Sequence, residues 1–291
     1  MSWITEPFAV DFMQRALLGG AMVTVICAVV GTWVVIRGMA FLGEAIGHGM
    51  LPGVAVATVL GAPPLVGGAV SAVAMSAAIG TLQRRGRLSF DSTIGLLFVG
   101  MLSLGIIIVS HSRSFATDAT TMLFGDVLAI RGPELATIAG ALVITLVVAA
   151  ACHRAFVAAA FDRRVAHVQG LRPALAQVAL VGLVTLAVVA SYQAVGSLLV
   201  VGLLLAPAIA AAPWTRRIPV RMALAAVLAV LAVTAGLLVS WHAGTAAGAT
   251  VAAAAIAVAA LSGALRVALD AVVTRGASHP RRPEPASLVT P

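Results

Sequence analysis

The amino-acid sequence predicts an all-α, polytopic membrane protein. Its mean hydropathy is +1.10, and 61% of its residues are hydrophobic while only 10% are charged, which is far from the balance of a water-soluble domain. Its apolar stretches are mostly about 20 residues long, the length of a helix that crosses the hydrocarbon core of a bilayer. They do not show the alternating pattern, about ten residues long, that is typical of membrane β-barrel strands.

Dividing the chain into spans of about 20 apolar residues predicts about nine transmembrane helices. Ala, Val, Leu and Gly supply most of the apolar residues, so the helices can approach one another closely through small side chains. The predicted ranges, in chain order, are 13–36, 41–60, 64–82, 92–111, 133–152, 174–192, 196–213, 221–240 and 246–268.

Two of these spans contain a proline that can interrupt or kink a helix. Pro52 follows Gly47 and Gly49 in the second span and removes one backbone hydrogen bond. Pro207 lies in the seventh span, after Gly196 and Gly202, and is a candidate hinge. The alternative for the seventh span is close packing of helices through small residues.

The distribution of arginine predicts how the chain is oriented in the membrane. Cytoplasmic loops carry an excess of basic residues, so the side with more arginines is expected to be cytoplasmic. This places the N-terminus outside and the C-terminus inside, as an odd number of spans requires. The expected cytoplasmic arginines are Arg37, Arg84, Arg85, Arg87, Arg154, Arg163, Arg164, Arg172, Arg216, Arg217, Arg221, Arg266, Arg275, Arg281 and Arg282.

The domain organisation is expected to be simple. Residues 1–270 form one transmembrane domain, and residues 271–291, rich in Pro and small polar residues, form a disordered cytoplasmic tail. The N-terminus has no basic region before its first apolar stretch and does not resemble a cleaved signal peptide.

The composition also excludes several classes of function. All 18 basic residues are Arg, and a chain without Lys cannot form the phosphate-binding loop of a P-loop ATPase. Cys27 and Cys152 are far apart and form no CxxC pair, so neither a structural disulfide nor a zinc knuckle is supported. Membrane topology accounts for the net charge of +8, so nucleic-acid binding is not indicated.

Glu44 and His48 form the first candidate site. Spaced i and i+4, they project from one helix face within a predicted span. An ionisable side chain in a span costs a few kcal/mol unless it faces a polar path or a partner. A carboxylate and an imidazole suit a divalent transition ion such as zinc or manganese. The alternative is a hydrogen-bonded Glu–His pair that binds no ion.

A second candidate group lies near the outer ends of the helices. Acidic residues in an outward vestibule would attract a divalent cation, and nearby histidines could ligate it. The alternative is that the acids cap turns and that the histidines are ordinary interfacial residues. The candidates are His111, Asp118, Asp126 and His242.

The inner loop, residues 155–173, is the longest predicted cytoplasmic connection. Its apolar residues fall on one face of a short amphipathic helix that Gly170 can end. Such a helix could lie on lipid headgroups, dock into a groove of a partner, or serve only as a connector.

Four stretches together resemble the permeases of ABC importers for zinc, manganese and iron: FLGEAIGHGMLPGVA, MLFGDVLAI, FDRRVAHVQGL and VGSLLVVGLLLAPAIAA. The resemblance covers roughly residues 10–268 and implies a non-catalytic transport subunit in a bacterial cell membrane. It implies a fold similar to the vitamin B12-type importer, a homodimer, cytoplasmic ABC ATPase subunits and an extracytoplasmic metal-binding protein. The expected cargo is zinc, with manganese or iron as alternatives, and no permanently bound cofactor is expected.

The resemblance also assigns roles to residues. Glu44 stands where the family usually has Asp, and Gly47 precedes His48 where the family has Ser; Glu44 and His48 are the implied metal-pathway ligands. Asp118 matches an acidic position at the outer mouth. The residues implied to contact the ATPase are Phe161, Asp162, Arg163, Arg164, Ala166 and Gly170.

The sequence also bears on three other functions. A siderophore or cobalamin permease of related fold would differ in the width of its path. A secondary transporter that works alone would use Glu44 as a proton-linked carboxylate and need no nucleotide. An intramembrane zinc protease is not supported, because the chain has no HExxH motif.

Overall fold

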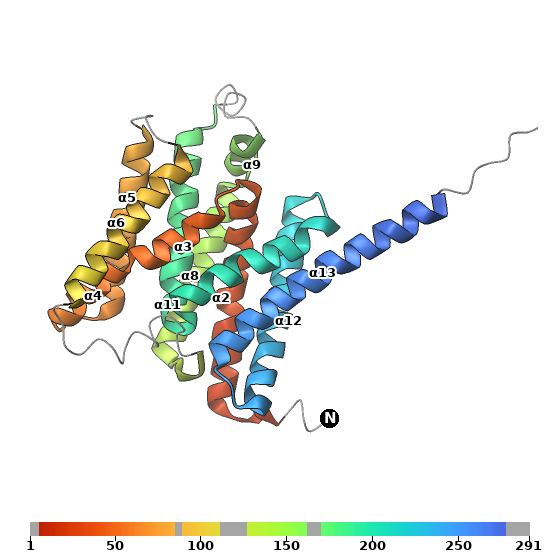
Figure 1. Cartoon of the computed structure of the whole chain (residues 1–291), viewed down its shortest axis with the longest axis horizontal. Coiled ribbons are helices and arrows are strands. Elements are labelled where there is room, and N and C mark those ends of the chain that lie inside the picture. Colours follow the sequence, from red (N-terminus) through yellow and green to blue (C-terminus); the bar gives the residue numbers. More distant parts are fainter. Residues whose placement is uncertain (1–5, 85–88, 111–126, 162–169, 278–291) are drawn as a thin grey trace, which may run out of the picture.

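The computed structural model describes residues 6–84, 89–110, 127–161 and 170–277 (Figure 1). Within these ranges the regular structure consists of α-helices and three short 3₁₀ helices, with no strand. The α-helices are α2 (Asp11–Ile36), α3 (Ala40–Gly49), α4 (Leu51–Val59), α5 (Pro64–Arg84), α6 (Phe90–Ser110), α8 (Gly132–Ala151), α9 (His153–Phe161), α11 (Pro173–Ala211), α12 (Ile218–Ala243) and α13 (Ala247–Ala277). The 3₁₀ helices are η1 (Pro7–Ala9), η2 (Val127–Ala129) and η3 (Ala212–Trp214).

The prediction of an all-α polytopic fold with about nine spans is confirmed. In the described part of the chain, eight helical segments are long and apolar enough to cross a membrane, and a shorter apolar helix covers Val200–Trp214. Each matches one predicted range in order. The segment Ala40–Val59 combines α3 and α4, and α11 contains both the sixth span and the shorter helix.

Helix α2 forms the centre of the bundle, where it packs against α8, α11 and α12 (Figure 1). In the most hydrophobic 18-residue stretch of α2, 72% is buried inside the protein, and the corresponding buried share is smaller in every other described span. Gly31 allows the closest approach, because a Cβ atom at this position would overlap the carbonyl oxygen of Leu204 in α11. Small residues thus let these backbones touch, as expected where apolar burial alone cannot drive association.

The second predicted span is broken where the sequence places Pro52. Helix α3 ends at Gly49, and α4 begins at Leu51 with Pro52 in its first turn, where a missing N–H is tolerated. Immediately beyond the break, Gly53 of α4 and Gly67 of α5 meet backbone to backbone, since a Cβ on either glycine would overlap the other's carbonyl oxygen.

Helix α11 changes direction at Gly196, which has φ 74° and ψ 168°. Only glycine adopts this region readily, so the break needs this residue. The sequence analysis gave Pro207 as a candidate hinge, with close packing through small residues as the alternative. In the structure Pro207 lies inside the second half of the helix, and the residue with non-helical dihedral angles is Gly196. The fixed φ of proline is compatible with a helix, so Pro207 costs the helix only one backbone hydrogen-bond donor. Gly196 has a positive φ, which a right-handed helix cannot accommodate.

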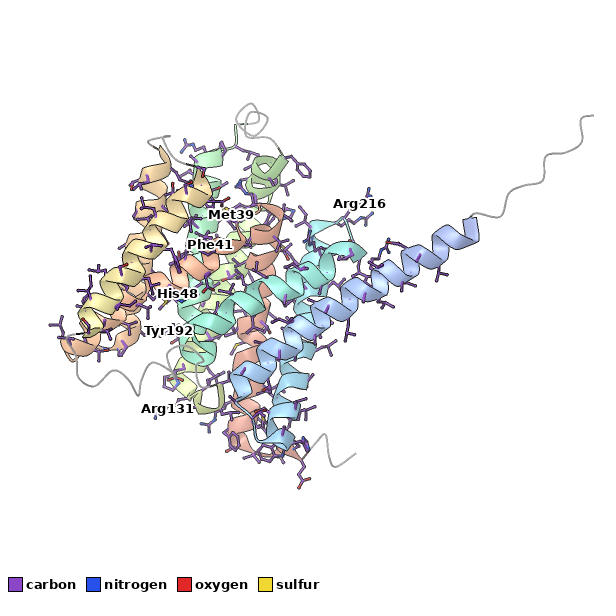
Figure 2. The ribbon with its side chains drawn as sticks, in the orientation of Figure 1. Met39, Phe41, His48, Arg131, Tyr192 and Arg216 are labelled. Carbon is purple, nitrogen blue, oxygen red and sulfur yellow. The ribbon has the colours of Figure 1, made fainter. Side chains whose placement is uncertain are left out.

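Three of the described connections lie toward one end of the bundle. The α2–α3, α8–α9 and η3–α12 connections lie together there, at the top of Figure 1. Arg216 marks this end and Arg131 lies toward the opposite end in Figure 2. Arg37 lies in the α2–α3 connection and Arg216 and Arg217 lie in the η3–α12 connection at this arginine-rich end, whereas Arg131 lies between η2 and α8. The orientation in the membrane stays a prediction.

The contact between Gly53 and Gly67 generates a stability prediction. Gly67→Ala forces α4 and α5 apart and should destabilise the fold by about 1–3 kcal/mol, as overpacking does. Gly80→Ala is the matched control, because Gly80 lies in the same helix with no atom near its Cβ position, and alanine favours a helix. Thermal unfolding in detergent should show a lower Tm for Gly67→Ala only. Equal Tm values would contradict the packing described here.

Candidate metal site

Glu44 and His48 lie on successive turns of α3, and their side chains contact each other. His48 Nδ1 is 3.2 Å from Glu44 Oε1 and also 3.2 Å from the Glu44 carbonyl oxygen. The side chains are 15% exposed for His48 and 27% for Glu44, so both are mostly enclosed by the protein but still accessible. The i, i+4 spacing thus produces one compact pair on one helix face.

The pair leaves specific atoms available to a ligand. A proton on Nδ1 of His48 satisfies both nearby oxygens of Glu44, and this tautomer gives Nε2 a free lone pair. A carboxylate that orients a metal-binding imidazole through its other nitrogen is a common arrangement at metal sites. The His48 carbonyl is not one of these atoms: Pro52 has no N–H to serve as its i+4 helical donor, but a backbone N–H at the C-terminal cap of α3 bonds to it instead.

The break beside the pair is held by a side chain from α5. Ser71 Oγ donates a 2.7 Å hydrogen bond to the carbonyl of Gly49, the last residue of α3. Buried backbone carbonyls in lipid need such partners, because no water is present to replace a missing helical bond. The interruption next to His48 is therefore a fixed feature.

One aromatic ring, from α6, contacts the imidazole, and a second ring, from α3, packs against the first. The Phe98 ring meets the His48 ring nearly edge-on, with centroids 5.3 Å apart. Phe41 packs on Phe98 in the same manner at 5.4 Å. Helix α6 thus shields one side of the pair, and His48 lies within the bundle in Figure 2.

A single chain offers only two candidate metal ligands at this site, Glu44 and His48. Among the described residues, no group of three or more His, Cys, Asp or Glu side chains could hold a metal ion together. Structural metal sites usually have four protein ligands, so this arrangement can bind an ion only with help from water or another chain. Such incomplete ligation suits passage of an ion better than storage.

The outer candidates do not join this pair. His242 lies in the last turn of α12, is exposed, and has Nδ1 2.8 Å from the Leu238 carbonyl. His111, Asp118 and Asp126 fall outside the described residues. The predicted outer vestibule therefore stays a prediction.

The inner loop begins with the short helix α9. Phe161 ends this helix with its side chain 84% exposed, and Gly170, at φ 71°, lies just before α11. Asp162, Arg163, Arg164 and Ala166 lie in a range that the structure does not describe. The described ends show an exposed apolar ring at the start of the segment expected to bind the ATPase.

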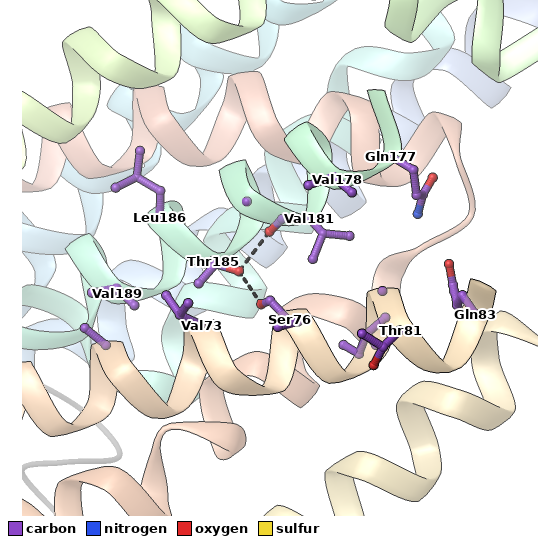
Figure 3. Close-up of a pocket in the computed structure, with 15 residues that line it drawn as sticks. Val73, Ser76, Thr81, Gln83, Gln177, Val178, Val181, Thr185, Leu186 and Val189 are labelled. Carbon is purple, nitrogen blue, oxygen red and sulfur yellow. Dashed lines mark hydrogen bonds between the residues drawn. The ribbon is translucent and has the colours of Figure 1, made fainter. Parts of the chain in front are cut away.

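A cavity of about 730 Å³ lies elsewhere, between α5 and α11 (Figure 3). Its wall is mainly apolar, with Ser76 and Thr185 hydrogen-bonded to each other at 2.6 Å and with Gln83 and Gln177 toward one end. Neither Glu44 nor His48 lines it, and it contains no charged side chain. No His, Cys, Asp or Glu side chain lines it.

Residues 9–266 match the ABC 3 transport family. The chain belongs to this family.

Relatives of this ABC 3 transport family member carry metal-specific names. The manganese transport system membrane protein MntC of Halalkalibacterium halodurans is 34% identical over 185 residues, 64% of this chain and 63% of that protein. The chelated iron transport system membrane protein YfeD of Yersinia pestis is 35% identical over 196 residues, 67% of this chain and 65% of that protein. The matched region thus spans slightly less than two thirds of the length of these relatives.

A solved structure of similar fold supports the architecture of this ABC 3 family member. The structure of PsaBC from Streptococcus pneumoniae in complex with Fab matches with a TM-score of 0.78 and 27% identity. The match covers 90% of this chain and 94% of that chain. The bundle described above is therefore a known membrane transport fold.

The sequence analysis did not identify Phe98 or Ser71 as parts of the site. Both come from other helices and reach the site, Phe98 at His48 and Ser71 at Gly49, only because α5 and α6 pack against α3 and α4. A serine in an apolar span is the one local signal for Ser71, because it needs a hydrogen-bond acceptor in lipid. Phe98 has no such signal, since aromatic residues in a span are ordinary.

The cover that Phe98 forms over His48 predicts its chemical reactivity. In purified protein, diethyl pyrocarbonate should modify exposed His242 faster than enclosed His48. Phe98→Ala should raise the rate at His48 several-fold and leave the rate at His242 unchanged. Mass spectrometry of the two peptides measures both rates in one sample. An unchanged His48 rate would show that Phe98 does not shield it.

Proposed function

We propose that this chain is the membrane-spanning permease subunit of an ATP-driven importer of divalent transition-metal ions. Membership of the ABC 3 transport family and the metal-specific names of its relatives support this proposal. The chain has no Lys for a phosphate-binding loop, so a partner must hydrolyse ATP. Its own role is to provide the path and not to catalyse a reaction.

The observation that carries the proposal is the Glu44–His48 pair inside a span. Placing an ionisable residue at the centre of a bilayer costs about 2.5–3.5 kcal/mol on insertion scales, so such residues usually serve a function. The carboxylate and the Nε2 atom of His48 would provide oxygen and nitrogen ligands at one point along the span. An ion that has lost part of its water shell could bind there briefly and then continue.

The proposed importer requires three further components. A second copy of this chain facing the first would double the ligand set to two carboxylates and two imidazoles. A cytoplasmic ABC ATPase would bind the inner loop near Phe161, and an extracytoplasmic binding protein would deliver the ion to the opposite face. The arginine-rich end of the bundle is the proposed cytoplasmic end, with the C-terminus inside and the N-terminus outside.

The cargo belongs to the class that oxygen and nitrogen ligands bind. The sequence analysis favoured zinc, whereas the relatives above are named for manganese and iron. Carboxylate ligands suit manganese, imidazole suits zinc and iron, and one of each does not choose among them. We rank manganese first because of the relatives and keep zinc and iron as alternatives.

Removing the ligands should abolish transport without preventing assembly. We expect Glu44→Ala and His48→Ala to eliminate metal uptake by proteoliposomes that contain the whole importer, because the path then lacks its ligands. Glu134→Gln is the matched control, since Glu134 accepts a capping hydrogen bond from the Arg131 N–H at the outer end of α8, and glutamine can replace it. Normal uptake by well-assembled Glu44→Ala and His48→Ala variants would contradict the proposal. Uptake without nucleotide would favour a secondary transporter instead.

Competition between ions identifies the cargo. Uptake of radioactive manganese by the wild-type importer should fall when unlabelled manganese is added in excess. If manganese is the cargo, equal zinc or iron should compete less well. Stronger competition by zinc than by manganese would instead support the cargo that the sequence analysis favoured.

A further inference from the structure

The inner loop is joined to the central helix by a cluster of rings. The Trp33 ring, in the last turns of α2, meets Phe156 of α9 with centroids 5.2 Å apart and His153 at 5.5 Å, both in edge-on geometry. Trp33 and Phe156 are fully buried. Paired buried rings of this kind are held in a defined orientation. Helix α9 is therefore packed against α2 as well as being connected to α8 through the chain.

A charged hydrogen bond reinforces this contact one turn further along α2. Arg37 Nη1 donates to the carbonyl of Ala159, in the last turn of α9, at 3.2 Å. Arg37 is also the residue that ends α2. The backbone of Arg37 thus caps α2 while its guanidinium lies at the C-terminal turn of α9, where the partial negative charge of the helix end favours a cation.

The turn after Arg37 forms a rigid connection between this contact and the candidate metal site. Gly38 has φ 65°, its N–H bonds to the Val35 carbonyl at 3.2 Å, and the Met39 N–H bonds to Val34 at 2.9 Å. These two bonds form a Schellman motif, a compact helix end that fixes the exit direction of the chain. Helix α3 starts at Ala40, so Glu44 follows within about one turn of the joint.

The start of α11 contacts the same joint. Gln177 Nε2 donates to Met39 Sδ at 3.5 Å, from the first turns of the helix that follows the inner loop. Both ends of the inner loop therefore contact the three-residue connection between α2 and α3: α9 through Arg37 and α11 through Met39. Figure 2 shows Met39 beside the start of α3 at the arginine-rich end of the bundle.

We propose that Trp33 and Arg37 are positioning residues that couple movement of the inner loop to α3, and so to Glu44 and His48. The inference rests on the proposed function. When an ATPase moves α9 through exposed Phe161, the ring cluster and the Arg37–Ala159 bond move the end of α2 with it. The Schellman turn then carries the displacement into α3 and changes how the two ligands face the path.

The amount of metal transported per ATP hydrolysed tests this role, because misfolding would lower both quantities together. In proteoliposomes containing the whole importer, Arg37→Ala should lower this ratio by about tenfold, the effect of losing one charge-assisted hydrogen bond. ATP hydrolysis should continue. Arg37→Lys keeps the charge and a donor, and we expect it to restore part of the ratio.

Arg221 provides a matched control within the same chain. Its Nη2 donates to the Ala208 carbonyl at 3.2 Å, joining α12 to the end of α11 at the same side of the bundle, but it does not contact α9 or α3 through this bond. Arg221→Ala should leave the ratio at the wild-type value even if it lowers Tm.

The outcomes separate the two proposals. If the wild-type importer moves no metal with ATP, the proposed function fails. If the wild type is coupled and Arg37→Ala keeps the wild-type ratio, only the coupling role is overturned. Should Arg37→Ala fail to assemble, Arg37→Lys and Trp33→Phe carry the test, because both are conservative; a reduced ratio in both supports the role, and an unchanged ratio in either overturns it.

Discussion

The cost of placing ionisable groups in a medium without water is the constraint on which the rest of this structure depends. Glu44 and His48 lie within a span and reduce that cost by contacting each other at 3.2 Å while remaining partly exposed. The pairing satisfies Nδ1 of the imidazole and leaves Nε2 available. The contact that lowers this cost is therefore the same contact that would orient the imidazole in the proposed metal path.

The surrounding helices hold this pair on a rigid support. Gly31, Gly53 and Gly67 allow backbones to touch, and Ser71 satisfies a carbonyl at the break in the second span. Close packing of this kind transmits displacement and deforms little. A movement imposed at the inner end of the bundle would therefore reach α3 with little loss, which is why the contact between α9 and the end of α2 matters for coupling.

The sequence was sufficient for the spans and for the spacing of the candidate ligands. Long apolar stretches mark helices in lipid because backbone groups must bond internally there, and this physics depends only on local sequence. The i, i+4 spacing likewise predicted that Glu44 and His48 share a helix face. Pro52 marked the break in the second span. The break in α11, however, lies at Gly196 and not at Pro207, since backbone freedom decided the position rather than loss of one donor.

What sequence reasoning missed depends on tertiary contacts. Phe98 covers His48 because α6 packs on α3, and Arg37 reaches the Ala159 carbonyl across more than a hundred residues of chain. The arginine was assigned a role only in membrane topology, since one sequence gives no indication of which carbonyl a cytoplasmic arginine will reach. Such partners become visible only when the helices are placed in space.

X-ray absorption spectroscopy of the loaded importer tests the central claim most directly, namely that Glu44 and His48 ligate the transported ion. With manganese bound, the account predicts a first shell of oxygen and nitrogen atoms together with the outer-shell scattering of imidazole, and loss of the imidazole scattering in His48→Ala. A spectrum with sulfur ligands, or one that His48→Ala leaves unchanged, would contradict it.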